Sequence, residues 1–384
     1  MRTLGIDLGT THTVAAATAS IVPLRGDSAK GNSLLPSIVA FPPAGGVLVG
    51  QAARERRGND PANTIVSAKR VIGRSYSSYS VQRYLERSAV PVVRTSSGGT
   101  AFETRAGIVT PVDVATHVLR ELAQAGQMDP SRLSAVVSVP AAFAEPERAA
   151  TVEAVRAAGF AEARVVEEPV ATAIAYLARS SLKYAVVYDL GGGTFDVAIV
   201  DCSKYPFRVI AHGGDAYLGG DDVDLALAEL VADRVLRESG WDLSTDDEVW
   251  QRLLIEAERA KLRLAVEEHT TIDLAVVDPA APTQLTTLGI DRRVLRDRAE
   301  DLIRRTFLIC DQVLCDAGIR AREVDAVFLA GGSTLLPGLR DDVREYFGKR
   351  ARFDLDPMHV VAIGASVAAA RPDLSALLDP AYVR

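Results

Sequence analysis

Two segments far apart in the chain share a residue pattern that could bind phosphate. In each, an apolar strand-like run leads into Asp-Leu-Gly, then into a turn of glycine and threonine, and then into a second apolar run. The first copy is Thr3–Thr11 and the second is Val186–Thr194. Their aspartates, Asp7 and Asp189, lie 182 positions apart, about half of the 384-residue chain. The repeat predicts two similar hairpins, one at the start of each half of the chain.

Turns of this composition suit a phosphorylated ligand that is bound together with a metal ion. Glycine leaves the backbone N–H groups of a turn accessible, and a nest of such groups binds anions. Carboxylates that face each other across a cleft suit Mg²⁺, which prefers oxygen ligands and keeps several of its waters. We therefore predict that Asp7 and Asp189 hold a hydrated Mg²⁺ against a nucleotide and that Asp196 assists. The alternative is two ordinary hairpin turns, where Asp and Gly are common, but the repetition favours phosphate binding.

A third glycine element, Leu329–Thr334, follows a predicted strand. Its Gly331-Gly332 pair would let the backbone lie flat against a sugar or a planar ligand. Other motifs of nucleotide or catalytic sites are absent: the sequence has no G-x-x-x-x-G-K-[ST] loop, no G-x-G-x-x-G that opens a helix and no G-x-S-x-G elbow. The five histidines show no metal-ligand spacing.

Composition and charge narrow the class of protein. Hydrophobic residues make up 48% and charged residues 24%, which is typical of a globular chain. The net charge of −7 argues against a general nucleic-acid binder. No secretory signal is visible and no apolar run approaches the ~20 residues that span a bilayer. Three cysteines cannot form a disulfide framework, so a soluble, cytoplasmic protein without a membrane partner is expected.

Helix and strand patterns alternate along the chain, which predicts an α/β fold of more than one lobe. Three predicted helices end at glycines: Pro146–Ala158, Arg293–Ala317 and Leu339–Phe347. Predicted strands are Ala135–Val139, Ala163–Glu167, Tyr184–Tyr188 and Asp325–Ala330. A long amphipathic helix, Asp247–Glu268, and a strand, Thr270–Val277, suggest an insertion.

Five separated motifs together resemble the nucleotide-binding domain of the heat-shock protein 70 family of chaperones (DnaK type), and the resemblance covers essentially the whole chain. Gly5–Thr11 is similar to the first phosphate loop of that family, Val187–Asp196 to its second, and Leu329–Thr334 to its adenosine motif. Glu167–Ala171 resembles its connecting motif, and Ala68–Arg74 resembles the segment that carries its catalytic lysine. All five occur in the order of the family.

The resemblance implies the actin-like ATPase (ribonuclease H-like) fold, an α/β fold of two lobes around a nucleotide cleft. Lobe I would span residues 1–183, with a core of 1–38 and 110–183 and an inserted subdomain at 39–109. Lobe II would span 184–372, with a core of 184–223 and 302–372 and an inserted subdomain at 224–301. Residues 373–384 resemble the hydrophobic interdomain linker, and no peptide-binding domain is expected in this sequence.

The resemblance also implies roles for single residues. Lys69 would position the attacking water and stabilise the transferring phosphoryl group, Glu168 would orient water or Mg²⁺, and Thr194 would bond near the γ-phosphate. Asp7 and Asp189 complete the catalytic set, with K⁺ expected near them. The implied nucleotide-binding residues are Gly9, Thr10, Thr11, Gly191, Gly192, Gly193, Asp196, Gly220, Glu258, Lys261, Gly331, Gly332 and Ser333.

Partner surfaces are implied as well. The family cooperates with J-domain co-chaperones and nucleotide exchange factors. Pro140 and Arg148 match the pair that relays the nucleotide state. Beside the retained Arg164, Glu167 and Val170 replace the usual Asn and Thr, so the J-domain surface is altered.

Together these features predict an ATP-binding, Mg²⁺-dependent ATP-hydrolysing domain of such a chaperone. Two alternatives share the fold: an actin-like ATPase that forms filaments, and a small-molecule kinase. The Gly-Gly-Gly-Thr-Phe-Asp loop and the helix with Glu258 and Lys261 favour the chaperone. No general base or polar acceptor pocket can be named for a kinase.

The base-binding region departs from the family pattern at three positions. Leu335 stands where an arginine usually stacks on adenine, Ala265 replaces a serine that contacts the base, and Met358 replaces an acid. Cation–π and hydrogen-bond contributions to base binding are therefore lost. We expect this chain to bind nucleotide more weakly than a typical member of the family, by about 1–3 kcal/mol.

We predict that Leu335→Arg tightens ATP binding by about 1–3 kcal/mol, because a guanidinium can stack on the base. Isothermal titration calorimetry of both proteins with ATP measures the difference. Equal affinities would contradict the prediction.

Overall fold

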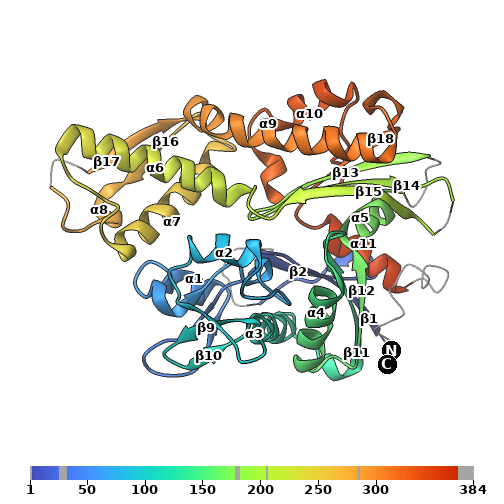
Figure 1. The fold of residues 1–384 in the computed structure, drawn as a ribbon, viewed down its shortest axis with the longest axis horizontal. Helices are drawn as coiled ribbons and strands as arrows, with labels where there is room; N and C mark the ends of the chain where they lie inside the picture. The colour runs from blue at the N-terminus through green and yellow to red at the C-terminus, as the bar shows by residue number, and fades with distance from the viewer. Residues whose placement is uncertain (1, 26–32, 178–181, 205, 283–285, 371–384) are drawn as a thin grey trace.

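The computed structural model describes residues 2–25, 33–177, 182–204, 206–282 and 286–370. Within them it is a mixed α/β protein built on two larger sheets (Figure 1). One sheet lies in the lower half of the view and the other in the upper half, with helices α5 (Glu168–Leu177) and α11 (Val360–Ala370) between them. The predicted linker-like segment 373–384 falls outside the described residues.

The sheet in the lower half has six strands. Their order is β12-β11-β1-β2-β3, and β4 also pairs with β2. Their bounds are Arg2–Leu8 for β1, His12–Ala17 for β2, Ser20–Ile21 for β3, Leu35–Pro36 for β4, Leu133–Val139 for β11 and Glu162–Glu167 for β12.

The sheet in the upper half has four strands in the order β15-β14-β13-β18. They are Tyr184–Leu190 for β13, Phe195–Asp201 for β14, Arg208–Asp215 for β15 and Ala326–Ala330 for β18.

The two predicted hairpins are confirmed, and both have the same surroundings. β1 pairs antiparallel with β2 and parallel with β11, while β13 pairs antiparallel with β14 and parallel with β18. Asp7 and Asp189 each stand one residue before the end of the first strand. The repeat in the sequence is therefore a repeat in topology, and it gives both aspartates the same position relative to their turns.

Three small sheets, nine further α-helices and five short 3₁₀ helices complete the described part of the chain. The small sheets comprise β5 (Val39–Ala40), β6 (Leu48–Val49) and β7 (Thr64–Ile65); β8 (Val92–Arg94), β9 (Thr100–Thr104) and β10 (Gly107–Val109); and β16 (His269–Asp273) and β17 (Thr287–Asp291). The helices are α1 (Gln51–Arg56), α2 (Tyr79–Leu85), α3 (Pro111–Ala125), α4 (Glu145–Ala157), α6 (Gly220–Ser239), α7 (Asp247–Leu264), α8 (Leu274–Val277), α9 (Arg292–Ala317) and α10 (Leu339–Phe347). No helix in the described ranges is long and apolar enough to cross a bilayer.

The glycine-terminated helices were predicted well. α10 has the predicted bounds, and α4 and α9 agree within one residue. Gly318 and Gly348 cap α9 and α10 in the left-handed conformation, with φ of 65° and 63°. Glycine has no Cβ and adopts this conformation at little cost, so a glycine after a helical pattern predicts the end of the helix.

The prediction for residues 247–277 was partly wrong. α7 ends at Leu264 instead of Glu268, and Arg292 Nε donates to the Leu264 carbonyl (2.9 Å), one of the groups that a helix end leaves unpaired. The predicted strand covers only β16, because Asp273 accepts hydrogen bonds from the backbone of Ala275 (3.0 Å) and Val276 (3.3 Å). Asp273 is thus the N-cap of the short helix α8. This helix was missed in the sequence because its apolar residues continue the pattern of the preceding strand.

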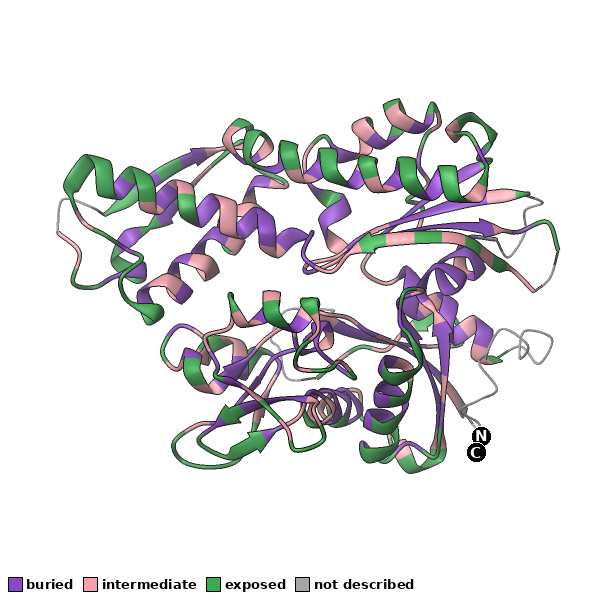
Figure 2. Ribbon diagram, in the orientation of Figure 1, coloured by how far each residue is buried: buried purple, intermediate pink, exposed green. Residues whose placement is uncertain are grey.

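A layer of small residues joins the two halves of the core. α5 and α11 are largely buried (Figure 2) and form one hydrophobic cluster with residues of both sheets, among them Val136 of β11 and Val187 of β13. Their backbones approach closely: a Cβ on Gly364 of α11 would lie 1.7 Å from the Ala171 carbonyl oxygen of α5. The position of α5, and of Glu168 at its start, therefore depends on this contact.

We predict that Gly364→Ala lowers the free energy of unfolding by about 3 kcal/mol, because the overpacked backbone contact outweighs the better helix propensity of alanine. Denaturant unfolding measures the loss. Gly289→Ala is the control, because a Cβ there meets no atom within 4 Å. Equal stability of the two variants would contradict the close contact.

Candidate functional site

A cavity of about 370 Å³ lies where the two hairpin turns meet the end of α7, the segment after β18 and the residues before α11. Most of the predicted site residues line it: Asp7, Gly9, Thr10, Thr11, Lys69, Glu168, Asp189, Gly191, Gly192, Thr194, Glu258, Lys261, Gly331, Gly332 and Ser333. The fold thus gathers residues from six separate segments into one space.

Three predicted residues lie behind the lining instead. Asp196 stands beside Asp189 in the β13–β14 register, below the floor of the cavity. The backbone N–H of Gly220 donates to the Gly191 carbonyl (3.1 Å), and the Gly193 carbonyl accepts from Arg70 Nη2 (2.8 Å). Gly193 and Gly220 therefore support the second turn from behind.

The two hairpin turns touch each other. A Cβ on Gly192 would lie 2.1 Å from Thr11 Oγ1, and one on Gly193 would lie 2.7 Å from Thr10 Cγ2. Only glycine permits this approach, since a side chain at either position would push the turns apart. Thr11 Oγ1 is buried and has no hydrogen-bond partner among the described residues, so it is a free donor at the junction of the turns.

Carboxylates from four elements meet beneath the turns. Asp7 accepts a hydrogen bond from Ser138 Oγ (2.9 Å) of β11. Glu168, the first residue of α5, pairs with Lys69 at 2.7 Å, and both side chains are largely buried. Asp189 and Asp196 face each other across the second hairpin. Four acids and one ammonium leave this cluster with an excess of negative charge when all are ionised.

The pKa values of the clustered side chains reflect this excess of negative charge. Burial and the neighbouring Glu168 raise the pKa of Asp7 to about 6, and the same two causes raise the pKa of Asp196 to about 7. Burial, Glu168 and Asp196 raise the pKa of Asp189 well above its usual value. Burial alone would lower the pKa of Lys69, but Glu168 and Asp7 outweigh it and raise that pKa, so Lys69 stays charged.

The donor set fits a hard divalent cation that is shared with a ligand. The clustered side chains offer carboxylate oxygens, which Mg²⁺ prefers, and their charge is not balanced within the protein. In the described part of the chain, no group of three His, Cys, Asp or Glu side chains could hold a metal ion alone. A divalent cation beside Asp7 and Asp189 would therefore need further ligands, such as water, from outside the protein.

The side chains predicted to contact the sugar and base line the cavity and also bond to other parts of the protein. Glu258 binds Arg54 Nη2 (2.8 Å), and Lys261 donates to Asp224 Oδ2 (2.7 Å) and to the Gly220 carbonyl (3.0 Å). Ser333 Oγ donates to the Gly191 carbonyl (2.8 Å). These contacts hold α7, α6 and the second turn together around the cavity.

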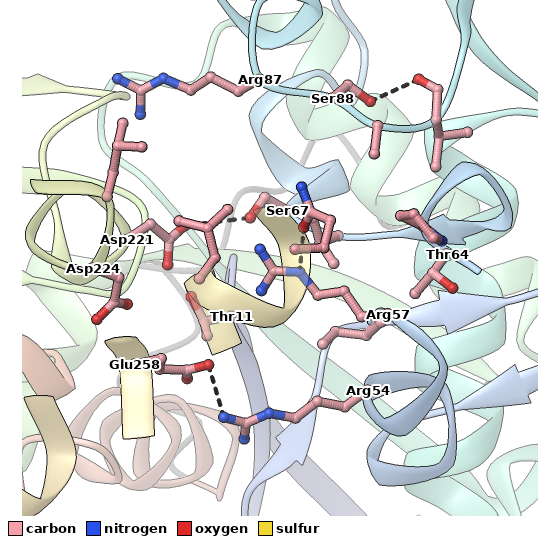
Figure 3. Close-up of a pocket in the computed structure, with 18 of the residues that line it drawn as sticks. Thr11, Arg54, Arg57, Thr64, Ser67, Arg87, Ser88, Asp221, Asp224 and Glu258 are labelled. Atoms are coloured by element: carbon pink, nitrogen blue, oxygen red, sulfur yellow. Dashed lines mark hydrogen bonds and ion pairs between the residues drawn. The ribbon is translucent and has the colours of Figure 1, made fainter. Parts of the chain in front are cut away.

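A second cavity of about 500 Å³ adjoins the first and shares Thr10, Thr11, His12, Asp221 and Glu258 with it. Figure 3 shows that Arg54 and Arg57 point into it from one wall, while Asp221, Asp224 and Glu258 point into it from the other.

Several of these residues were missed in the sequence. Arg70 contacts Asp221 at 3.1 Å and directly follows Lys69, so its proximity to the site could have been inferred. Nothing in the local pattern marks Arg54 or Asp224, because their partners are distant in the chain.

Comparison with models of known families places the chain in a family. The model of a family described as Hsp70 protein matches residues 3–372, nearly the whole chain. The match includes both hairpins, the Lys69 segment, α5 and the glycine pair after β18.

We predict that Mg²⁺ raises the melting temperature of the ADP-bound protein more at about pH 8 than at about pH 5. Because folding raises the pKa of Asp7 to about 6 and of Asp196 to about 7, the cluster favours protonation, and stability falls as pH rises through these values. A cation offsets the repulsion only when the acids are ionised. Thermal melts with Mg²⁺ and with chelator measure the effect.

Two variants test the source of that pH dependence. Asp7→Asn should remove much of the Mg²⁺ effect at the higher pH. Asp301→Asn, whose side chain is 91% exposed, should leave it unchanged. An Mg²⁺ effect of the same size at both pH values would show that the cluster does not bind the ion.

Proposed function

The chain belongs to the Hsp70 family, whose members are ATPases, and we propose that it binds ATP with Mg²⁺ between its two hairpin turns and transfers the γ-phosphoryl group to water. The observation that carries this proposal is the contact of the two turns directly above a charged Lys69–Glu168 pair and the two aspartates. In this reading the molecule is the ATPase part of a chaperone of that family.

The proposed division into two lobes follows the sheets. We propose lobe I as residues 1–183 and lobe II as 184–372, each with a core and an inserted subdomain, because each contains one of the large sheets and one hairpin. The smaller sheets β5–β7 and β8–β10 lie in the proposed insertion 39–109, and β16–β17 lies in the insertion 224–301.

The turns would bind the phosphate chain. Their backbone N–H groups and the hydroxyls of Thr10, Thr11 and Thr194 offer donors from both sides, and the unpartnered Thr11 Oγ1 supports this role. Asp7 and Asp189 would hold Mg²⁺, which supplies neutralisation of phosphate charge. K⁺ is proposed beside the same carboxylates, since their charge exceeds that of Lys69.

The Lys69–Glu168 pair would act on the attacking water. The Lys69 ammonium donates a hydrogen bond to Glu168 Oε1 (2.7 Å), which would leave other N–H groups to hold a water and to stabilise charge on the phosphoryl oxygens. Glu168 would orient the same water. Phosphoryl transfer depends mainly on such positioning and charge stabilisation, so this set is sufficient for hydrolysis.

The site also has a direct link to the surface. Arg148 of α4 binds Glu167 (2.8 Å), the residue before Glu168, and donates to the Phe143 carbonyl (2.9 Å). We propose that Arg148, together with Pro140, relays the nucleotide state to the rest of such a chaperone. A reducing, cytoplasmic location is proposed because all three cysteines are free.

Phosphate release from ATP by the full chain, with no added acceptor, tests the function. Release that requires Mg²⁺ is expected. Release only after addition of a small-molecule acceptor would indicate a kinase, and sedimentation that requires ATP would indicate a filament-forming ATPase. Absence of Mg²⁺-dependent release under all conditions would overturn the proposal.

We predict that Lys69→Ala lowers kcat at least about a hundredfold, because it removes a preorganised donor to the transition state. ADP binding should change little, since many backbone groups share it. Single-turnover assays and calorimetry measure the two effects.

The control for this variant is Lys183→Ala, which removes an exposed lysine outside the cavity. A melting curve of Lys69→Ala is needed as well, because the change leaves the buried Glu168 unpaired and destabilises the fold. Hydrolysis by folded Lys69→Ala at the parental rate would contradict the assigned role.

A further inference from the structure

The two ends of the 370 Å³ cavity differ in chemistry. The turns supply glycine backbone, threonine hydroxyls and carboxylates at one end. The other end is formed by the last turn of α7, by the residues after Gly332 and by the segment before α11. Its lining side chains are apolar: Leu262, Ala265, Val266, Leu335, Pro357 and Met358.

The polar side chains nearest the apolar end already have partners in the protein. Lys261 binds Asp224 and the Gly220 carbonyl, and Ser333 donates to the Gly191 carbonyl. Glu258 binds Arg54. Their hydrogen bonds position α7 and the second turn, and they use the single Ser333 hydroxyl donor and two of the three N–H donors of Lys261.

The backbone donors of this end are committed in the same way. The N–H groups of Ala265 and Val266 donate to the carbonyls of Lys261 (3.1 Å) and Arg263 (3.0 Å). The N–H of Gly331 donates to the Pro357 carbonyl (2.9 Å), and that of Met358 donates to Asp356 Oδ1 (2.9 Å). These four backbone N–H groups are therefore occupied within the chain and do not offer donors to the edge of a base.

The apolar end is also open to solvent. Leu262 is 57% exposed, Val266 81% and Leu335 41%. Large exposed apolar side chains gathered at the mouth of a cavity gain from being covered by a flat ligand. Because the mouth is open, flat ligands of different size and shape can fit there.

We infer that the site selects its ligand by the triphosphate and not by the base, so that it takes nucleoside triphosphates of both purine and pyrimidine type. This inference rests on the proposed nucleotide-binding function. A site that hydrogen-bonds a substrate group rejects analogues lacking it by about 10⁴ or more, whereas an apolar pocket separates isosteres by only about a hundredfold. Because its base-binding end is apolar, we expect this site to discriminate between bases as weakly as an apolar pocket does.

The test compares the Kd values of ATP, GTP, CTP and UTP for the full chain with Mg²⁺, by competition against one fluorescent nucleotide. We expect all four to bind within about a hundredfold of one another, with purines tighter because they cover more apolar area. Phosphate release should follow for each. Discrimination in favour of ATP greater than about a hundredfold would overturn the inference while leaving the ATPase proposal intact.

Leu335→Ala provides a second readout. It should weaken all four nucleotides by a similar factor and leave binding of Mg²⁺–tripolyphosphate, which has no base, unchanged. Leu308→Ala is the matched control, since this exposed leucine of α9 lies outside the cavity. A loss confined to ATP would show that the base is read at this position and would overturn the inference. Failure of every triphosphate to bind would instead overturn the proposed function as well.

Discussion

The contact between the two hairpin turns is the constraint on which the rest of the site depends. Gly192 meets Thr11, and Gly193 meets Thr10, at separations that leave no room for a Cβ. This approach brings together the aspartates of two strands that are otherwise in different sheets. Because each Asp has the same place relative to its turn, closing the turns onto each other sets the position of both carboxylates at once.

The contact between the turns brings carboxylates close together, and their repulsion is reduced by neighbouring lysine and arginine side chains. Burial and the neighbouring Glu168 raise the pKa values of Asp7, Asp189 and Asp196, and Lys69 compensates only part of the negative charge. Further out, arginines join the opposite walls: Arg54 binds Glu258 (2.8 Å) and Arg87 binds Asp222 (2.7 Å). Several such pairs together hold the walls of the cavities.

The sequence predicted local features well and distant pairings poorly. The hairpins and the ends of α9 and α10 follow from turn and glycine chemistry that acts over a few residues. Helix α8 was missed because its apolar residues resemble a strand until Asp273 is recognised as a cap.

The candidate site shows the same limit. Its glycines and aspartates could be named from the repeated motif. The engagement of Glu258 with Arg54 and of Lys261 with Asp224 depends on packing between α1, α6 and α7, and no local pattern encodes it.

The packing of α5 against α11 has a mechanical consequence. Glu168 begins α5, and further along the helix the Ala171 carbonyl meets Gly364 with no side chain between them. Contacts between backbones cannot be absorbed by a change of rotamer, and protein interiors are nearly incompressible. A displacement of α5 along its axis would therefore push on α11 at Gly364 instead of being absorbed by side chains between the two helices.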